Sequence, residues 1–150
     1  MPLRKLLEKE KMNMERIERG WAGHFCCGPN CNWRRNTLIK NDDGRMIVVS
    51  SVGALPKRNH FGNRIGWDSI GASRWYETMA FVAKVDGDSI FTEADVHKPI
   101  YTYNGQWQID REPDGKTDME AEKMHEDFVA FVMEHFDKCY ADGENYGRDE

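Results

Sequence analysis

The chain has 150 residues, of which 39% are hydrophobic and 31% charged, and its formal net charge is −5. That length is typical of one domain with a single core, and no apolar run reaches the roughly 20 residues that cross a bilayer. Residues 110–150 hold five basic and fourteen acidic side chains, a balance that disfavours general binding to duplex nucleic acid. Four cysteines without an expected signal peptide indicate a reducing, cytoplasmic compartment and no membrane partner.

The N-terminal part predicts a short helix and then a first strand. One side of residues 3–12 is rich in leucine, which favours a helix too short to be stable alone. From residue 14 to residue 25, apolar residues recur among charged ones, as in one or two strands broken by glycine. We therefore divide the chain into an N-terminal helical extension, a single α+β domain and a polar tail, at residues 1–13, 14–142 and 143–150.

Three dipeptides that favour tight hairpin turns follow, namely Asp43-Gly44, Asp86-Gly87 and Asn104-Gly105. Such pairs supply the positive φ angles that two-residue turns require. Each separates two runs with strand patterning, so together they predict an antiparallel hairpin meander of about five or six strands. Residues 55–73 lie between the first two hairpins and form a long connection rich in glycine and asparagine, which is expected to be functional or disordered.

The C-terminal region predicts one amphipathic helix. Thr117 and Glu120 have the spacing of a capping box, with Thr117 as the N-cap. An apolar stripe with helical spacing follows, and we expect it to lie on the sheet. Gly143 is a predicted stop. The predicted fold class is therefore α+β, an antiparallel sheet with one C-terminal helix packed on it and a short N-terminal helix.

Soft metal ligands cluster near the first strand. His24, Cys26, Cys27 and Cys31 lie within eight residues, and four such groups could hold zinc tetrahedrally. Their spacing contains no Cys-x-x-Cys pair, and a cysteine is also a common buried apolar residue. The preferred interpretation is therefore that no metal or other cofactor is bound, with zinc as the alternative.

The same stretch allows a thiol enzyme. His24 and Cys26 would share one face of a strand, so a pair of base and nucleophile is geometrically possible. The sequence reveals no orienting group, no oxyanion site and no familiar catalytic motif beside them. We therefore do not predict an enzyme.

Aromatic, guanidinium and hydroxyl groups alternate in residues 33–37 and 74–78. Arginine binds phosphate through two parallel hydrogen bonds, and aromatic rings stack on bases. Because neighbours on a strand face opposite ways, Arg34 and Arg35 cannot enter one pocket, and one of them is expected to pair with Glu77 or a helix acid. A solvated strand end with tryptophans in the core explains the pattern equally well. The predicted ligand-binding residues are Trp21, His24, Trp33, Arg34, Arg35, Arg58, Arg64, Arg74, Trp75 and Tyr76.

A resemblance extends over most of the chain, from Glu18 to Val132. It rests on the blocks ERGWAGHFCC, CNWRRNTLI, IVVSSVGA, RWYETMAFVAK, EADV and AEKMHEDFVA. These resemble a family of small phage and prophage proteins. In size, in the order of sheet then helix, and in phage setting, the chain is similar to the anti-Thoeris sponges, which sequester a cyclic ADP-ribose signal without cleaving it. No ligand-contacting residue is transferred from that family.

The resemblance implies a phage counter-defence protein in the cytoplasm of an infected cell, which binds a small nucleotide-like signal and does not cleave it. A homo-oligomer is expected, since pockets for cyclic ligands are commonly built at shared interfaces. One alternative is a protein-binding inhibitor of a host defence nuclease, similar to an anti-CRISPR protein, whose acidic helix imitates nucleic-acid charge. The other is the zinc or thiol enzyme centred on His24 and the cysteines.

Overall fold

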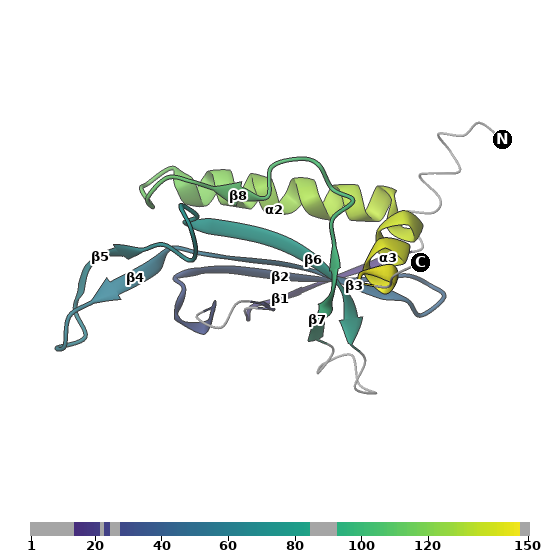
Figure 1. The fold of residues 1–150 in the computed structure, drawn as a ribbon, viewed down its shortest axis with the longest axis horizontal. Coiled ribbons are helices and arrows are strands. Elements are labelled where there is room, and N and C mark those ends of the chain that lie inside the picture. Colours follow the sequence, from purple (N-terminus) through teal and green to yellow (C-terminus); the bar gives the residue numbers. More distant parts are fainter. Residues whose placement is uncertain (1–13, 22, 25–27, 85–92, 148–150) are drawn as a thin grey trace.

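The predicted α+β architecture is confirmed in a computed structural model, which describes residues 14–21, 23–24, 28–84 and 93–147. A six-stranded antiparallel sheet has the order β1-β2-β3-β6-β7, with β8 also paired to β6, and β4 and β5 form a second, small sheet (Figure 1). The strands are β1 (Glu15–Arg19), β2 (Trp33–Lys40), β3 (Met46–Gly53), β4 (Leu55–Arg58), β5 (Arg64–Asp68), β6 (Tyr76–Lys84), β7 (Glu93–Ile100) and β8 (Gln108–Ile109). The helices are η1 (Gly28–Asn30), α2 (Thr117–Glu134) and α3 (Phe136–Asn145). The predicted N-terminal helix lies outside the described residues.

The hairpin between β2 and β3 is confirmed. Gly44 has a φ of +93°, and its N–H donates to the carbonyl of Asn41 at 3.0 Å. Strands β6 and β7 also pair antiparallel, although the Asp86-Gly87 turn that would join them lies outside the described residues. The positive φ of Gly44 therefore allows the tight turn that sets the register between β2 and β3.

The third hairpin prediction is wrong. Residues 101–107 leave the sheet, and β8 then pairs with the start of β6, on the edge that β7 occupies further along. The reason is aromatic packing: the ring of Tyr103 lies 4.3 Å from that of Phe128 and 5.2 Å from that of Phe131, both on α2. A side chain at Gly105 would collide with Tyr103. Glycine at this position therefore leaves room for the Tyr103 ring and does not form the predicted hairpin turn.

Helix α2 crosses one face of the sheet (Figure 1). Apolar residues that alternate along the central strands meet its apolar stripe, because strand periodicity places every second residue on the helix side. The main core cluster contains Ile39, Ile47, Val49, Ala80, Ile100, Phe128, Val129, Val132, Phe136 and Cys139. Among the described residues, neither helix has the length and apolar character needed to cross a bilayer.

The predicted helix boundaries need three corrections. The capping box does not form; instead the carboxylate of Asp114 accepts the N–H groups of Lys116 and Thr117 at 2.7 and 3.1 Å, while Glu120 pairs with Arg111. The single predicted helix is broken between α2 and α3. Gly143 lies inside α3 and does not end it. A side chain there would meet Val82 at 2.6 Å, so glycine allows α3 to pack closely on β6.

A buried polar cluster lies beneath α2. His125 is completely buried; its Nε2 lies 2.8 Å from the hydroxyl of Thr37, and its Nδ1 lies 2.6 Å from that of Ser51. Ser51 in turn lies 2.6 Å from the hydroxyl of Thr78. Two strands thus present hydroxyl groups directly to the imidazole, and a third strand joins the cluster through Ser51. Since buried polar groups must be hydrogen-bonded, this cluster fixes how α2 sits along the sheet.

Stability is expected to fall in mild acid because of His125. Burial, together with the charge of Arg35, lowers the pKa of His125 from 6.5 to about 4. The unfolded chain therefore takes up a proton between these pH values and the folded chain does not. The neutral imidazole contributes stability above pH 6.5, and at most about 3 kcal/mol of unfolding free energy is lost as the pH falls towards 4.

Urea unfolding at half-unit pH steps measures this loss. His125→Gln should flatten the profile between pH 6.5 and 4.5, whereas His97→Gln, at an exposed histidine, should leave its slope unchanged. An unchanged slope in His125→Gln would refute the assignment.

Candidate functional site

A hollow of about 460 Å³ opens at the edge of β6, in the gap between β7 and β8. It forms because the pairing of β6 changes partner: the N–H of Thr78 donates to the carbonyl of Trp107 at 2.8 Å, and pairing with β7 begins only at Ala80. The intervening loop stands away from the strand. The volume of the hollow is in the range of small-molecule sites. The hollow is lined by Arg74, Glu77, Thr78, Met79, Ile100, Tyr101, Tyr103, Trp107 and Phe128.

Aromatic rings form much of the wall. Tyr103 is held against α2, as described above, whereas Tyr101 and Trp107 are 60% and 38% exposed. Tyr101 also lies 5.6 Å from the ring of Tyr146, just after α3. Exposed rings beside a concave surface offer flat contact area at low conformational cost.

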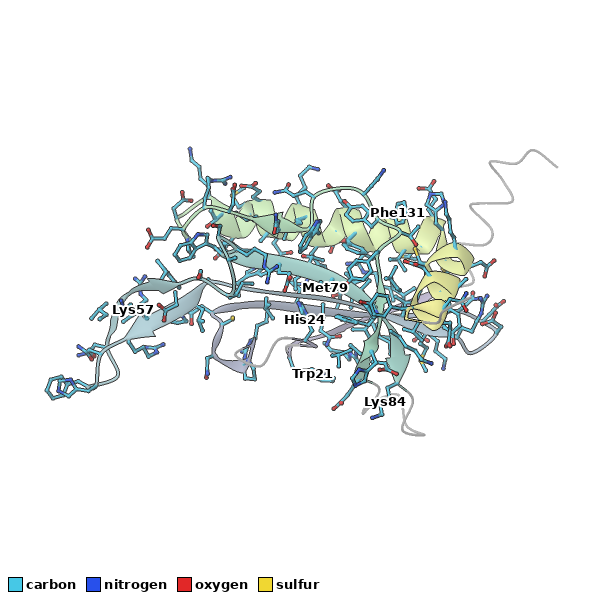
Figure 2. All side chains as sticks on the ribbon, in the orientation of Figure 1. Trp21, His24, Lys57, Met79, Lys84 and Phe131 are labelled. Carbon is cyan, nitrogen blue, oxygen red and sulfur yellow. The ribbon has the colours of Figure 1, made fainter. Side chains whose placement is uncertain are left out.

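Glu77, one of the residues that line the hollow, carries a buried carboxylate. Glu77 is 6% exposed; one of its oxygens lies 3.2 Å from Nε2 of His24, and the other lies 3.7 Å from Nε of Arg74. Burial raises the pKa of Glu77, but the hydrogen bond with His24 and the charges of His24 and Arg74 outweigh it and lower the pKa. Figure 2 places His24 on the side of the sheet away from α2. The carboxylate is therefore held from the far side of the sheet.

Arg74 contributes a donor that is not satisfied. Its Nε is buried and has no hydrogen-bond partner among the described residues, while its guanidinium carbon lies 6.0 Å from the centre of the Trp107 ring. A side chain at Gly71 would collide with this guanidinium, so glycine there leaves room for it. A buried donor without a hydrogen-bond acceptor costs about 1–3 kcal/mol, and the charge of Glu77, with an oxygen 3.7 Å from this Nε, offsets part of that cost.

Two serine–histidine contacts resemble parts of a catalytic triad. Nδ1 of His24 lies 2.7 Å from the hydroxyl of Ser50, so Ser50, His24 and Glu77 stand in a row. Ser50 is completely buried, and its hydroxyl already accepts the N–H of Gly23 at 3.1 Å. Ser51 beside His125 is equally buried. These contacts orient the imidazoles and, in this conformation, present neither hydroxyl to a substrate.

Trp33 and Arg35 lie on the helix face. The indole of Trp33 donates to Glu122 at 3.2 Å. Arg35 pairs with Glu122, and with Glu18 and Glu126 at 3.0 Å each. The expectation that one of the two neighbouring arginines pairs with a helix acid is therefore confirmed for Arg35.

Several acidic side chains of α2 are paired with basic side chains rather than only with water. Besides the two that bind Arg35, Glu120 pairs with Arg111, and Asp127 pairs with Lys123 at 2.6 Å. Much of the negative charge of this helix is thus matched by nearby cations.

Three further residues that were predicted to bind ligand instead pack in the core or against a neighbouring side chain. The hydroxyl of Tyr76 is buried and donates to Asp118 at 2.5 Å. Trp75 is partly buried and packs on the cluster that contains Tyr76. Trp21 lies under the guanidinium of Arg19, 4.8 Å from its carbon. None of the three lines the hollow.

The remaining predicted arginines gather around β4 and β5. Arg34 and Arg58 line a second, more open hollow of about 620 Å³, and the guanidinium of Arg64 lies 4.4 Å from the ring of Trp67. The ten predicted residues therefore do not form one site: only Arg74 lines the first hollow, with His24 directly behind it. The sequence analysis does not identify Glu77 or the aromatic residues of the loop as lining the hollow, because the stretch IYTYNGQWQ has the pattern of a hairpin.

The zinc alternative is only partly covered by the described residues. Cys26 and Cys27 lie outside them. Cys31 is buried against Val52 and Ile70, and both ring nitrogens of His24 already have partners. Within the described ranges, no group of three or more metal-ligating side chains could hold a metal ion.

Arg74→Gln tests the charge pairing at Glu77. The substitution leaves a buried carboxylate with one cationic neighbour fewer, so we expect the unfolding free energy to drop by about 2 kcal/mol. Adding Glu77→Gln should recover part of that loss, because the double variant has no charge left to compensate. Urea unfolding of the single and double variants at pH 7 measures the coupling, and strictly additive losses would show that the two residues do not interact.

Comparison with known proteins adds no family to this geometry. No protein-family model matches the chain, and the comparisons with curated proteins and with solved structures gave no match either.

Proposed function

We propose that the chain captures a small, flat, anionic molecule of the nucleotide class in the hollow beside β6 and holds it unchanged. The observation that carries this proposal is the coexistence, in one hollow, of exposed aromatic rings, the buried carboxylate of Glu77 and the unsatisfied donor of Arg74. Concave aromatic surfaces with a few convergent polar groups are the usual form of a small-molecule site.

The polar groups favour a ligand with both donors and acceptors. Glu77, whose pKa is lowered, is an acceptor for an amine or hydroxyl group. Arg74 is a donor for a phosphate or carbonyl oxygen. A nucleoside phosphate supplies both kinds of group and also a flat ring that can stack on Trp107 or Tyr101. Since Arg74 is the only cation among the residues that line this hollow, one phosphate contact is expected.

Capture without conversion suits the buried state of the candidate nucleophiles. Neither Ser50 nor Ser51 is exposed, and the contacts of His24 fix Glu77 in place. A sponge requires tight binding but no proton-transfer pair. Together with the resemblance to phage proteins, this favours a counter-defence role in an infected cell, in which the protein sequesters a cyclic nucleotide or ADP-ribose-type signal. We extend the proposal to a homo-oligomer, whose mass light scattering would measure.

Thermal shift against cyclic nucleotides and ADP-ribose derivatives tests the proposal. A ligand at 100 times its dissociation constant adds about 2.7 kcal/mol of stability, which for this chain length corresponds to a rise of about 5 to 10 °C in Tm. Trp107→Ala should abolish the shift, because its ring is exposed at the hollow, while melting in buffer remains nearly unchanged. Arg58→Gln, at the end of β4 and outside this hollow, is the control and should keep the full shift.

The fate of the ligand separates capture from turnover. The bound molecule should be recovered intact after heat denaturation of the complex. A hydrolysed product would identify an enzyme, and the absence of any shift across the panel would reject the proposed ligand class.

A further inference from the structure

Residues 55–73 were expected to form a long connection that is functional or disordered, and residues 55–68 within it form a two-stranded ribbon, here called the arm. Strands β4 and β5 pair antiparallel and extend away from the body of the protein, with Lys57 along the ribbon (Figures 1 and 2). The turn is well defined: Gly62 has a φ of +84°, and the side chain of Asn59 accepts the N–H groups of Phe61 and Asn63 at 3.0 Å each. The arm is thus an ordered projection.

The cations of the arm differ from those of the body. On the body, Arg35, Arg45 and Arg111 are each paired with at least one acid. Lys57, Arg58 and Arg64 form no ion pair with any residue that the structure describes. Arg58 makes one hydrogen bond, to the carbonyl of Gly62 at 3.0 Å. The arm therefore carries positive charge that is not neutralised internally, on a chain whose formal net charge is −5.

The same cationic character continues to the root of the arm. Arg34 and Arg58 both line the open hollow of about 620 Å³ between η1 and β4, and Asp68 is the single acid in its lining. Arg34 donates to the carbonyl of Pro29 at 2.8 Å, and it too has no acidic partner in the described part of the chain. Four unpaired cations thus extend from the root of the arm towards its tip.

The tip of the arm also carries exposed rings. Phe61 is 77% exposed, and its ring lies 4.0 Å from that of His60. Despite this contact, most of the Phe61 side chain remains exposed, and hydration of such an apolar group is unfavourable. Unpaired cations combined with exposed stacking surfaces are the two features by which proteins bind single strands, whose bases are free to stack.

We infer that the arm binds single-stranded nucleic acid, with Lys57, Arg58, Arg64 and Arg34 contacting phosphates and Phe61 stacking on a base. A single strand fits better than a duplex, because it can follow a narrow ribbon along Lys57, Arg58 and Phe61. A wider duplex would come closer to Asp114 and Asp118, which share a hollow with Arg64 at the root of the arm. This site is separate from the hollow beside β6 and does not depend on the function proposed for it.

Fluorescence anisotropy with labelled oligothymidylate of about 15 nucleotides, at several salt concentrations, tests this inference. The triple variant Lys57→Gln, Arg58→Gln, Arg64→Gln should bind at least about tenfold more weakly at low salt and show a salt slope smaller by about 2. The matched control Lys84→Gln, Lys116→Gln, Lys138→Gln changes the net charge equally, at exposed residues elsewhere, and should bind as the wild type does. Phe61→Ala should weaken binding about tenfold.

Three outcomes would overturn the inference. They are equal losses in the arm variant and the control variant, affinity for duplex DNA equal to that for the single strand, and competition by polyglutamate as effective as by oligonucleotide. The last would show that the arm binds acidic protein surfaces. Circular dichroism and melting of each variant in buffer confirm the fold, and Trp107→Ala should retain oligonucleotide binding.

Discussion

The carboxylate of Glu77 imposes the tightest physical constraint on this structure. An ionised carboxylate removed from water costs several kcal/mol unless charged or hydrogen-bonding groups surround it. His24 and Arg74, which lie 53 and three residues away in sequence, meet that requirement. His24 is thereby held to the far face of the sheet, and Arg74 is held at the edge of β6. Glu77 and Arg74, which compensate each other's charge, are also the charged residues that line the hollow.

The other face of the sheet supports the hollow in a different way. His125 fixes α2 over the hydroxyl groups of three strands, and Phe128, one helical turn further on, then forms part of the hollow's wall and packs on Tyr103. Buried polar groups that are fully satisfied make a core specific as well as stable. Two buried imidazoles on opposite faces therefore hold the two sides of one candidate site.

Local sequence patterns predicted the parts of the fold that depend on local physics. The Asp43-Gly44 turn and the opposite orientation of Arg34 and Arg35 follow from backbone conformation and strand periodicity alone. The hollow could not be predicted, because its walls come from residues 74–79, 100–107 and 128. At Asn104-Gly105 a strong turn signal led to a wrong hairpin, since packing of Tyr103 on α2 outweighed it. The ordered arm and the Asp114 cap likewise depend on contacts outside the predicted motifs.

The central claim is that the hollow beside β6, and not the arm, receives the small nucleotide-type ligand. Two-dimensional NMR of the indole N–H groups tests it directly, because Trp107 lines the hollow while Trp67 lies on the arm. Titration with the panel member that gives the largest thermal shift should move the Trp107 signal and leave that of Trp67 in place. A shift confined to Trp67, or no shift of either signal at saturating ligand, would contradict the account.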